Sequence, residues 1–175
     1  MMPLPTHLRD FVSPNESVLD ESELVGSVCC PCGSREFTLL FPGHTQEYRG
    51  ELTPCTAEVD GSFFFLITVA CASCGKEHLL IDQDFHGWNG FVCHDESQAA
   101  KPRPPLVPWK CLACGGVRHA GTVRVHSPGR QGFVEEAGNE FDVERWPDGF
   151  DWFTVAIRCS ACGKETPEWV SLETM

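Results

Sequence analysis

The sequence predicts a small, mainly β fold built from two tandem units with little helix. Cys-x-x-Cys pairs recur along the chain, aromatic and β-branched runs stand beside them, and glycine and proline are frequent, at 16 and 13 of the 175 residues. Aromatic and β-branched residues favour strands, whereas glycine and proline favour turns. A chain of this length suits one compact domain or two small ones.

The cysteine pairs form two matched sets, because one constant shift maps the run from Cys71 to Glu77 onto the run from Cys159 to Glu165. Each set contains an opening and a closing pair. The predicted metal ligands are Cys29, Cys32, Cys71, Cys74, Cys111, Cys114, Cys159 and Cys162. Cys29 is preferred to Cys30 as the first ligand because the repeat aligns Cys30 with Leu112.

The repeat divides the chain into four segments. Residues 1–27 form an N-terminal segment, residues 28–94 the first unit, residues 95–108 a Pro-rich polar linker, and residues 109–175 the second unit. In the N-terminal segment, Ser13-Pro14-Asn15-Glu16 has the form of a capping box with proline at the first helical position. This motif predicts a short helix over about residues 14–24.

Strands are expected around the closing cysteine pairs. The runs 63–69 and 152–157 are aromatic and β-branched, which is typical of buried strands. Asp60-Gly61 and Asp148-Gly149 precede these runs. Because glycine accepts the positive φ of tight hairpin turns, each Asp-Gly pair predicts a hairpin.

Two further strands are expected after the opening cysteine pairs. Between residues 117 and 126 polar and apolar residues alternate, so that the valines share one face while Arg118, Arg124 and His126 share the other. Residues 35–41 are the expected equivalent in the first unit.

Two Cys-x-x-Cys turns together supply the four thiolates that zinc prefers in closed structural sites. The pattern resembles the zinc-ribbon fold group, in which two such turns at hairpin ends clamp one metal ion. The resemblance implies two zinc-ribbon-like β units with long hairpins between their cysteine turns, and two Zn²⁺ ions per chain. It implies no activity, since this fold group serves many unrelated roles. Iron is the smaller alternative, because Cys-Pro-x-Cys-Gly-like turns also resemble rubredoxin.

Redox or catalytic cysteines are the competing interpretation. A redox Cys-x-x-Cys normally stands alone at a helix N-terminus, whereas this chain carries matched pairs and no recognisable catalytic motif. We therefore expect no enzyme activity. Cys30, Cys55 and Cys93 are left over. A weaker hypothesis is a third cluster of Cys93 and His94 with residues upstream of them, namely His78, Asp82, Asp84 and His86.

The N-terminus lacks the apolar segment of a signal peptide, and no apolar run is long enough to span a bilayer. These features predict a cytoplasmic protein, in which reduced thiols are available to bind metal.

The net charge of −12 is unevenly distributed. Residues 97–134 contain only basic charged residues, whereas residues 135–151 are rich in acids and are expected to form the neighbouring strand. Cross-strand ion pairs would then neutralise the basic residues. The acidic remainder favours a basic protein partner, with the chain acting as an adaptor or inhibitor. The alternative partner is nucleic acid, bound through the basic stretch 101–130.

Overall fold

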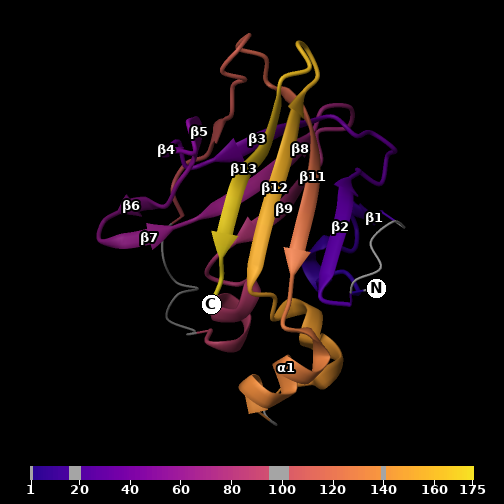
Figure 1. The fold of residues 1–175 in the computed structure, drawn as a ribbon. Helices are drawn as coiled ribbons and strands as arrows, with labels where there is room; N and C mark the ends of the chain where they lie inside the picture. Colours follow the sequence, from indigo (N-terminus) through magenta and orange to yellow (C-terminus); the bar gives the residue numbers. More distant parts are fainter. Residues whose placement is uncertain (1, 16–20, 95–102, 139–140) are drawn as a thin grey trace.

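The computed structural model describes residues 2–15, 21–94, 103–138 and 141–175. The fold is mainly β, as predicted (Figure 1). Its strands are β1 (Val12–Pro14), β2 (Glu23–Val28), β3 (Phe37–Phe41), β4 (Thr45–Tyr48), β5 (Glu51–Pro54), β6 (Ala57–Val59), β7 (Ser62–Phe64), β8 (Leu66–Cys71), β9 (Glu77–Asp82), β10 (Val107–Pro108), β11 (Arg118–His126), β12 (Trp152–Cys159) and β13 (Glu165–Glu173).

The helical elements are short. They are α1 (Gly129–Ala137) and the turns η1 (Thr6–Leu8), η2 (Trp88–Val92) and η5 (Val143–Asp148). Among the described residues, none of the helices has the length and apolar character needed to cross a bilayer.

Strand β11 joins the two predicted units into one sheet. Its C-terminal half pairs with β2, its first residues pair with β3, and β12 lies along its other edge. The main order is β1-β2-β11-β3-β8-β9, with β13 beside β12 and β10 beside β3. In Figure 1, β13, β12, β11 and β2 lie in front, and β3, β8 and β9 cross behind them.

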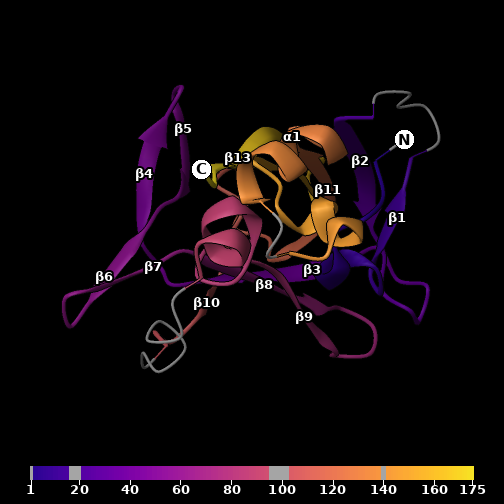
Figure 2. The ribbon, with the colours of Figure 1, turned by 90° about the horizontal axis from the view of Figure 1, so that it is seen from below.

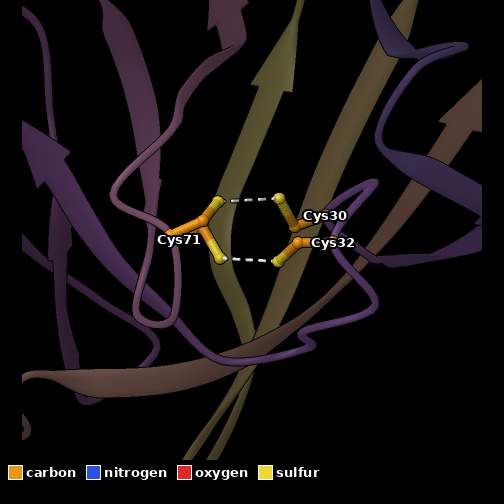
Figure 3. A group of neighbouring side chains, drawn as sticks. Cys30, Cys32 and Cys71 are labelled. Carbon is orange, nitrogen blue, oxygen red and sulfur yellow. Dashed lines mark hydrogen bonds between the residues drawn. The ribbon is translucent and has the colours of Figure 1, made fainter.

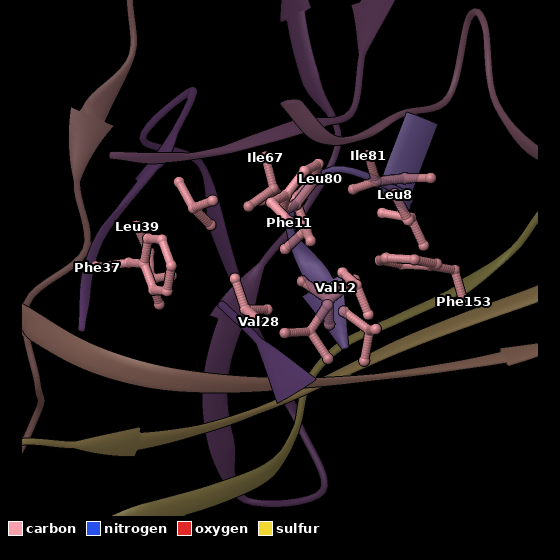
Figure 4. Packing of buried hydrophobic residues seen from close by; sticks show 14 of the residues in the cluster. Leu8, Phe11, Val12, Val28, Phe37, Leu39, Ile67, Leu80, Ile81 and Phe153 are labelled. Atoms are coloured by element: carbon pink, nitrogen blue, oxygen red, sulfur yellow. The ribbon is translucent and has the colours of Figure 1, made fainter. Parts of the chain in front are cut away.

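An apolar core lies between these two groups of strands (Figure 4). Ile67 from β8 packs in the same cluster as Val123 from β11 and Phe153 from β12, and all three side chains are fully buried. Each of the predicted units, residues 28–94 and residues 109–175, therefore contains one set of cysteines. The main sheet and the core, however, are built from residues of both units.

Two hairpins lie outside the main sheet. β4 pairs with β5 and β6 pairs with β7, and Figure 2 shows both hairpins on the side of the molecule away from β1. Ion pairs Arg49–Glu168, at 2.6 Å, and Lys164–Glu51, at 2.8 Å, join the β4–β5 hairpin to the beginning of β13.

The strands expected near residues 35–41 and 117–126 are confirmed as β3 and β11. Burial along β11 alternates as expected, with Val123 and Val125 inside and Arg124 and His126 exposed.

The two Asp-Gly pairs differ in outcome. Asp60 and Gly61, with φ of 51° and 76°, form the predicted hairpin turn between β6 and β7. The prediction for Asp148-Gly149 is wrong, since Asp148 ends η5 and Gly149 has φ of −90°. The Asp148 carboxylate accepts hydrogen bonds from Thr6 and Arg145, which hold this segment against η1.

Three other expectations need correction or fall on residues outside the description. The acidic segment 135–151 is not a strand beside β11, because it contains the end of α1 and all of η5. The prediction of a helix over residues 14–24 is wrong at both ends, because Pro14 belongs to β1 and Glu23 and Leu24 belong to β2. Residues 16–20, between these ends, lie outside the described residues. Of the predicted linker, residues 95–102 also lie outside them.

Candidate metal centres

The second cysteine group lies where the turn before β11 meets the turn between β12 and β13. Its members are Cys111, Cys114, Cys159 and Cys162, whose sulfurs all lie within 4.8 Å of one another. The Sγ–Sγ distance is 3.6 Å both for Cys111–Cys162 and for Cys114–Cys159.

Backbone hydrogen bonds shape both turns of this second centre in the same way. The N–H of Gly115 donates to the carbonyl of Cys111 at 2.7 Å, and that of Gly163 donates to the carbonyl of Cys159 at 2.9 Å. Both glycines have φ near 75°, at 74° and 75° respectively. This left-handed conformation suits glycine and reverses the chain directly after each cysteine pair.

The first centre contains Cys30, Cys32, Cys71 and Cys74, again with all sulfurs within 4.8 Å (Figure 3). The Sγ–Sγ distances are 3.6 Å for Cys30–Cys74 and 3.5 Å for Cys32–Cys71. This centre lies between the turn after β2 and the turn between β8 and β9.

Cys30, and not Cys29, belongs to the first group, which corrects the prediction. Inward-facing residues alternate along β2 through Leu24 and Val28, and this period carries Cys30 to the inside, where it is 2% exposed. Cys29 instead continues the backbone pairing with the N-terminal segment, donating its N–H to Phe11 at 2.8 Å. The alternation of β2 was the sequence signal that identifies Cys30.

The opening turn of the first centre is consequently one residue shorter than that of the second. Gly33 donates to the carbonyl of Cys30 at 2.8 Å, in the role that Gly115 has toward Cys111. The spacing is thus Cys30-x-Cys32 in the first centre and Cys111-x-x-Cys114 in the second.

Both groups have the dimensions of a tetrahedral thiolate site. Sulfurs bound 2.3 Å from one zinc ion lie about 3.8 Å apart, close to the observed separations. A disulfide would require about 2.05 Å, and all the cysteines are free. In each group two cysteines are buried and two are exposed, so each group lies between the apolar interior and the surface. Each group could therefore hold one metal ion.

The pKa values of the grouped thiols depart from the ordinary thiol value in both directions. The backbone N–H of Cys74 lowers the pKa of Cys71 to about 6, and, against the opposing effect of burial, the N–H groups of Ala113 and Cys114 lower that of Cys111 to about 7. In contrast, the pKa of Cys30 rises to about 12: burial and neighbouring thiols outweigh the N–H of Cys32. A bound cation would replace the protons of such high-pKa thiols.

A histidine accompanies each centre, which sequence reasoning missed. His78 Nε2 lies 3.7 Å from Cys30 Sγ, and its ring stacks on Phe11 with centroids 4.7 Å apart. At the second centre, the fully buried His119 lines a small cavity together with Cys111 and Cys159. The two histidines occupy unrelated positions in the repeat, so the cysteine alignment does not reveal them.

The weaker third cluster is not assembled among the described residues. His78 lies beside the first centre, while His94 Nδ1 contacts the Asp84 carbonyl at 3.1 Å. Asp82 pairs with Arg103 at 2.6 Å. Cys55 and Cys93 lie outside both cysteine groups.

His86 instead stacks on His7, with ring centroids 3.7 Å apart. Burial, together with the neighbouring His86, lowers the pKa of His7 to about 3. Burial likewise lowers the pKa of His86 to about 4, although Asp148 opposes the shift. This stack joins η1 to the loop after β9 and is a packing feature distinct from the metal centres.

Comparison of the chain with protein-family models, with curated proteins and with solved structures found no match. The functional argument therefore rests on the two cysteine groups and on the charges of the surrounding surface.

Proposed function

We propose that the chain is a zinc-stabilised, non-enzymatic binding protein that recognises a basic protein partner through its acidic surface. Two four-cysteine groups support the metal part, because a set of four thiolates is typical of closed structural zinc sites. Such a site leaves no open coordination position for a substrate, which favours a structural role. Free thiols in both groups fit a cytoplasmic location.

The distribution of ion pairs is the observation that supports a basic partner. Three arginines of the basic stretch are paired within the chain: Arg103 with Asp82, Arg124 with Glu23 at 3.5 Å, and Arg130 with Glu144 at 2.7 Å. By contrast, Glu135 and Glu136 on α1 are exposed. A net charge of −12 is then largely presented to solvent, where it would steer a basic protein toward the surface.

Charge reversal on α1 tests this function. The immobilised, zinc-loaded chain and its Glu135→Lys, Glu136→Lys variant would be exposed to a host lysate at increasing salt, and captured proteins would be identified. We expect a basic protein that the wild type retains at about 0.1 M salt and loses toward 1 M, where the Debye length falls from about 10 Å to about 3 Å. The reversed variant should capture much less of it. Equal capture by both chains would contradict the acidic-surface proposal.

Nucleic acid is the second candidate, and one observation favours it. Arg118, Arg124 and His126 all lie on the outer face of β11. However, Arg124 pairs with Glu23, and His126 lies 2.7 Å from Asp151, so only Arg118 of the three is without an acidic partner in the described part of the chain. Tight, salt-sensitive binding of DNA or RNA that is lost in an Arg118→Ala, Arg124→Ala variant would establish this alternative.

A further inference from the structure

We propose that a hollow on the outer face of the sheet binds a small phosphate-bearing molecule of nucleotide size. This hollow, which we call the arginine hollow, lies over β2, β11 and β12 and has a volume of about 530 Å³. The residues that carry the argument are Ser27, Arg35, Ala120, Thr122, Ala156 and Arg158. It would be a binding site additional to the acidic surface invoked above.

Small side chains form the floor of the arginine hollow. Thr122 lies directly opposite Ser27 on one side and opposite Ala156 on the other, and residues opposite one another in antiparallel strands share a face. The intervening residues Val123 and Val155 point inward and are fully buried. A row of short side chains across three strands leaves a depression that larger residues would fill.

Two arginines without an acidic partner stand at this depression. Arg35 and Arg158 are exposed, and neither has a carboxylate within 4.0 Å among the described residues, whereas five other arginines of the chain form ion pairs. Glu165 lies opposite Arg158 in the β12–β13 register and also lines the hollow, but forms no ion pair with it. Free guanidinium groups are unexpected in a chain of net charge −12, and they give the hollow a local positive charge.

Arg118 adds to this charge. It precedes Ala120 by two residues on β11 and is exposed on the same outer face. A guanidinium group presents two parallel N–H donors to phosphate oxygens, so Arg35 and Arg158 provide the specific contacts and Arg118 provides attraction at longer range. The Thr122 hydroxyl offers a further donor at the floor.

The size and surroundings of the hollow favour a small ligand over a nucleic-acid strand. Its volume falls in the range of about 300–1,000 Å³ that is usual for small-molecule sites. Farther along the same face, Glu173 on β13 brings a carboxylate near the other end of the sheet, and Arg124 is already paired with the carboxylate of Glu23. A long polyanion would have to cross these carboxylates, whereas a single phosphate group would not.

Calorimetric titration of the zinc-loaded protein with adenosine 5′-monophosphate, adenosine and inorganic phosphate tests the proposal. We expect the monophosphate to bind, inorganic phosphate to bind more weakly, and adenosine not to bind. An Arg35→Ala, Arg158→Ala variant should lose at least tenfold in affinity for the monophosphate. Arg130→Ala, which removes an exposed arginine paired with Glu144, should bind as the wild type does.

A second variant keeps every charge and blocks the space. Ala156→Phe should fill the floor and lower the affinity for the monophosphate at least tenfold, with zinc content and the melting temperature monitored to verify folding. No binding of the monophosphate, equal binding of adenosine, or unchanged affinity in a folded blocking variant would overturn the proposal. So would an oligonucleotide that binds much more tightly than the monophosphate through the same arginines. None of these outcomes tests the acidic surface, which is read out separately by protein capture.

Discussion

The two cysteine centres have the same donor set but reach it by different local routes. The second centre follows the repeat, with two residues between Cys111 and Cys114, whereas the first has one residue between Cys30 and Cys32. The first centre also has an additional thiol beside it, because Cys29 lies next to Cys30 in the chain and its Sγ lies 3.7 Å from the Cys30 carbonyl. The periodicity of the preceding strand therefore selects the ligand, even where the repeat favours another residue.

The largest effect should follow loss of a closing-turn cysteine. Cys71→Ser and Cys159→Ser should each reduce zinc from two ions to one and strongly destabilise the chain, since structural zinc binding contributes about 10–16 kcal/mol against a typical net stability of about 5–15 kcal/mol. Because both centres are attached to one sheet and one core, each variant should melt as a whole in calorimetry. Melting of either variant at the wild-type temperature would show that its cysteine is not a ligand.

The pair Cys29→Ser and Cys30→Ser sharpens the difference between the centres. Cys30→Ser should lose about one equivalent of zinc and much of the stability, because it removes one of the four donors of the first centre. Cys29→Ser should retain both ions and melt close to the wild type. Elemental analysis and calorimetry of the two variants measure this directly, and the reverse order would restore the repeat-based choice of ligand.

Acid should destabilise the fold through His7 and His86, which lie apart from the metal centres. Their pKa values, lowered by burial to about 3 and about 4, lie below the unfolded value of 6.5, so the fold favours the neutral rings. Their contribution to stability is complete above pH 6.5 and is lost as the pH falls toward 4, by about 1.4 kcal/mol per pH unit for each histidine. The groups facing them are Asp148 and Arg103 beside His86, and the Leu80 backbone beside His7.

Urea unfolding at pH 7.0 and 5.5, with bound zinc measured at each pH, would test this effect. A His7→Phe, His86→Phe variant should lose less stability over this interval than the wild type does. If the wild type and the variant lose the same amount of stability and release zinc, the acid sensitivity comes from the cysteine centres alone.

The smallest effect should come from the histidine beside the first centre. His78→Gln removes the ring whose Nε2 lies 3.7 Å from Cys30 Sγ. Mutation of a residue that contacts a metal ligand typically lowers the metal affinity by about 10–100-fold. One of the two zinc ions should therefore be lost more readily to a chelator. Two-phase release in the variant, with one phase matching the wild type, would agree with this role. An unchanged rate for both ions would contradict it.

Local patterns in the sequence were sufficient for the fold class, for the strands near residues 35–41 and 117–126, and for every grouped cysteine except Cys30. Such features depend on alternation and spacing within a few residues, so they can be read along the chain. The shared sheet could not be predicted in this way. Pairing of β11 with both β2 and β3 joins residues that are distant in sequence and carry no matching signal.

The incorrect predictions also have physical causes. Asp148-Gly149 has the composition of a hairpin turn, but hydrogen bonds from Thr6 and Arg145 to the Asp148 carboxylate stabilise a helical turn instead. Charge alone favours a strand for the acidic segment 135–151. In the structure this segment contains the end of α1 and all of η5, and α1 is anchored by Phe133, which is buried against Trp88 with ring centroids 5.9 Å apart.

The metal content of the wild-type protein tests the central claim most directly. Elemental analysis of protein purified without chelator should find two zinc ions per chain, one for each four-cysteine group, and a colourless solution. An intense red-brown absorption with stoichiometric iron would show that these centres bind iron and not zinc. Protein that is folded and free of metal would contradict the account.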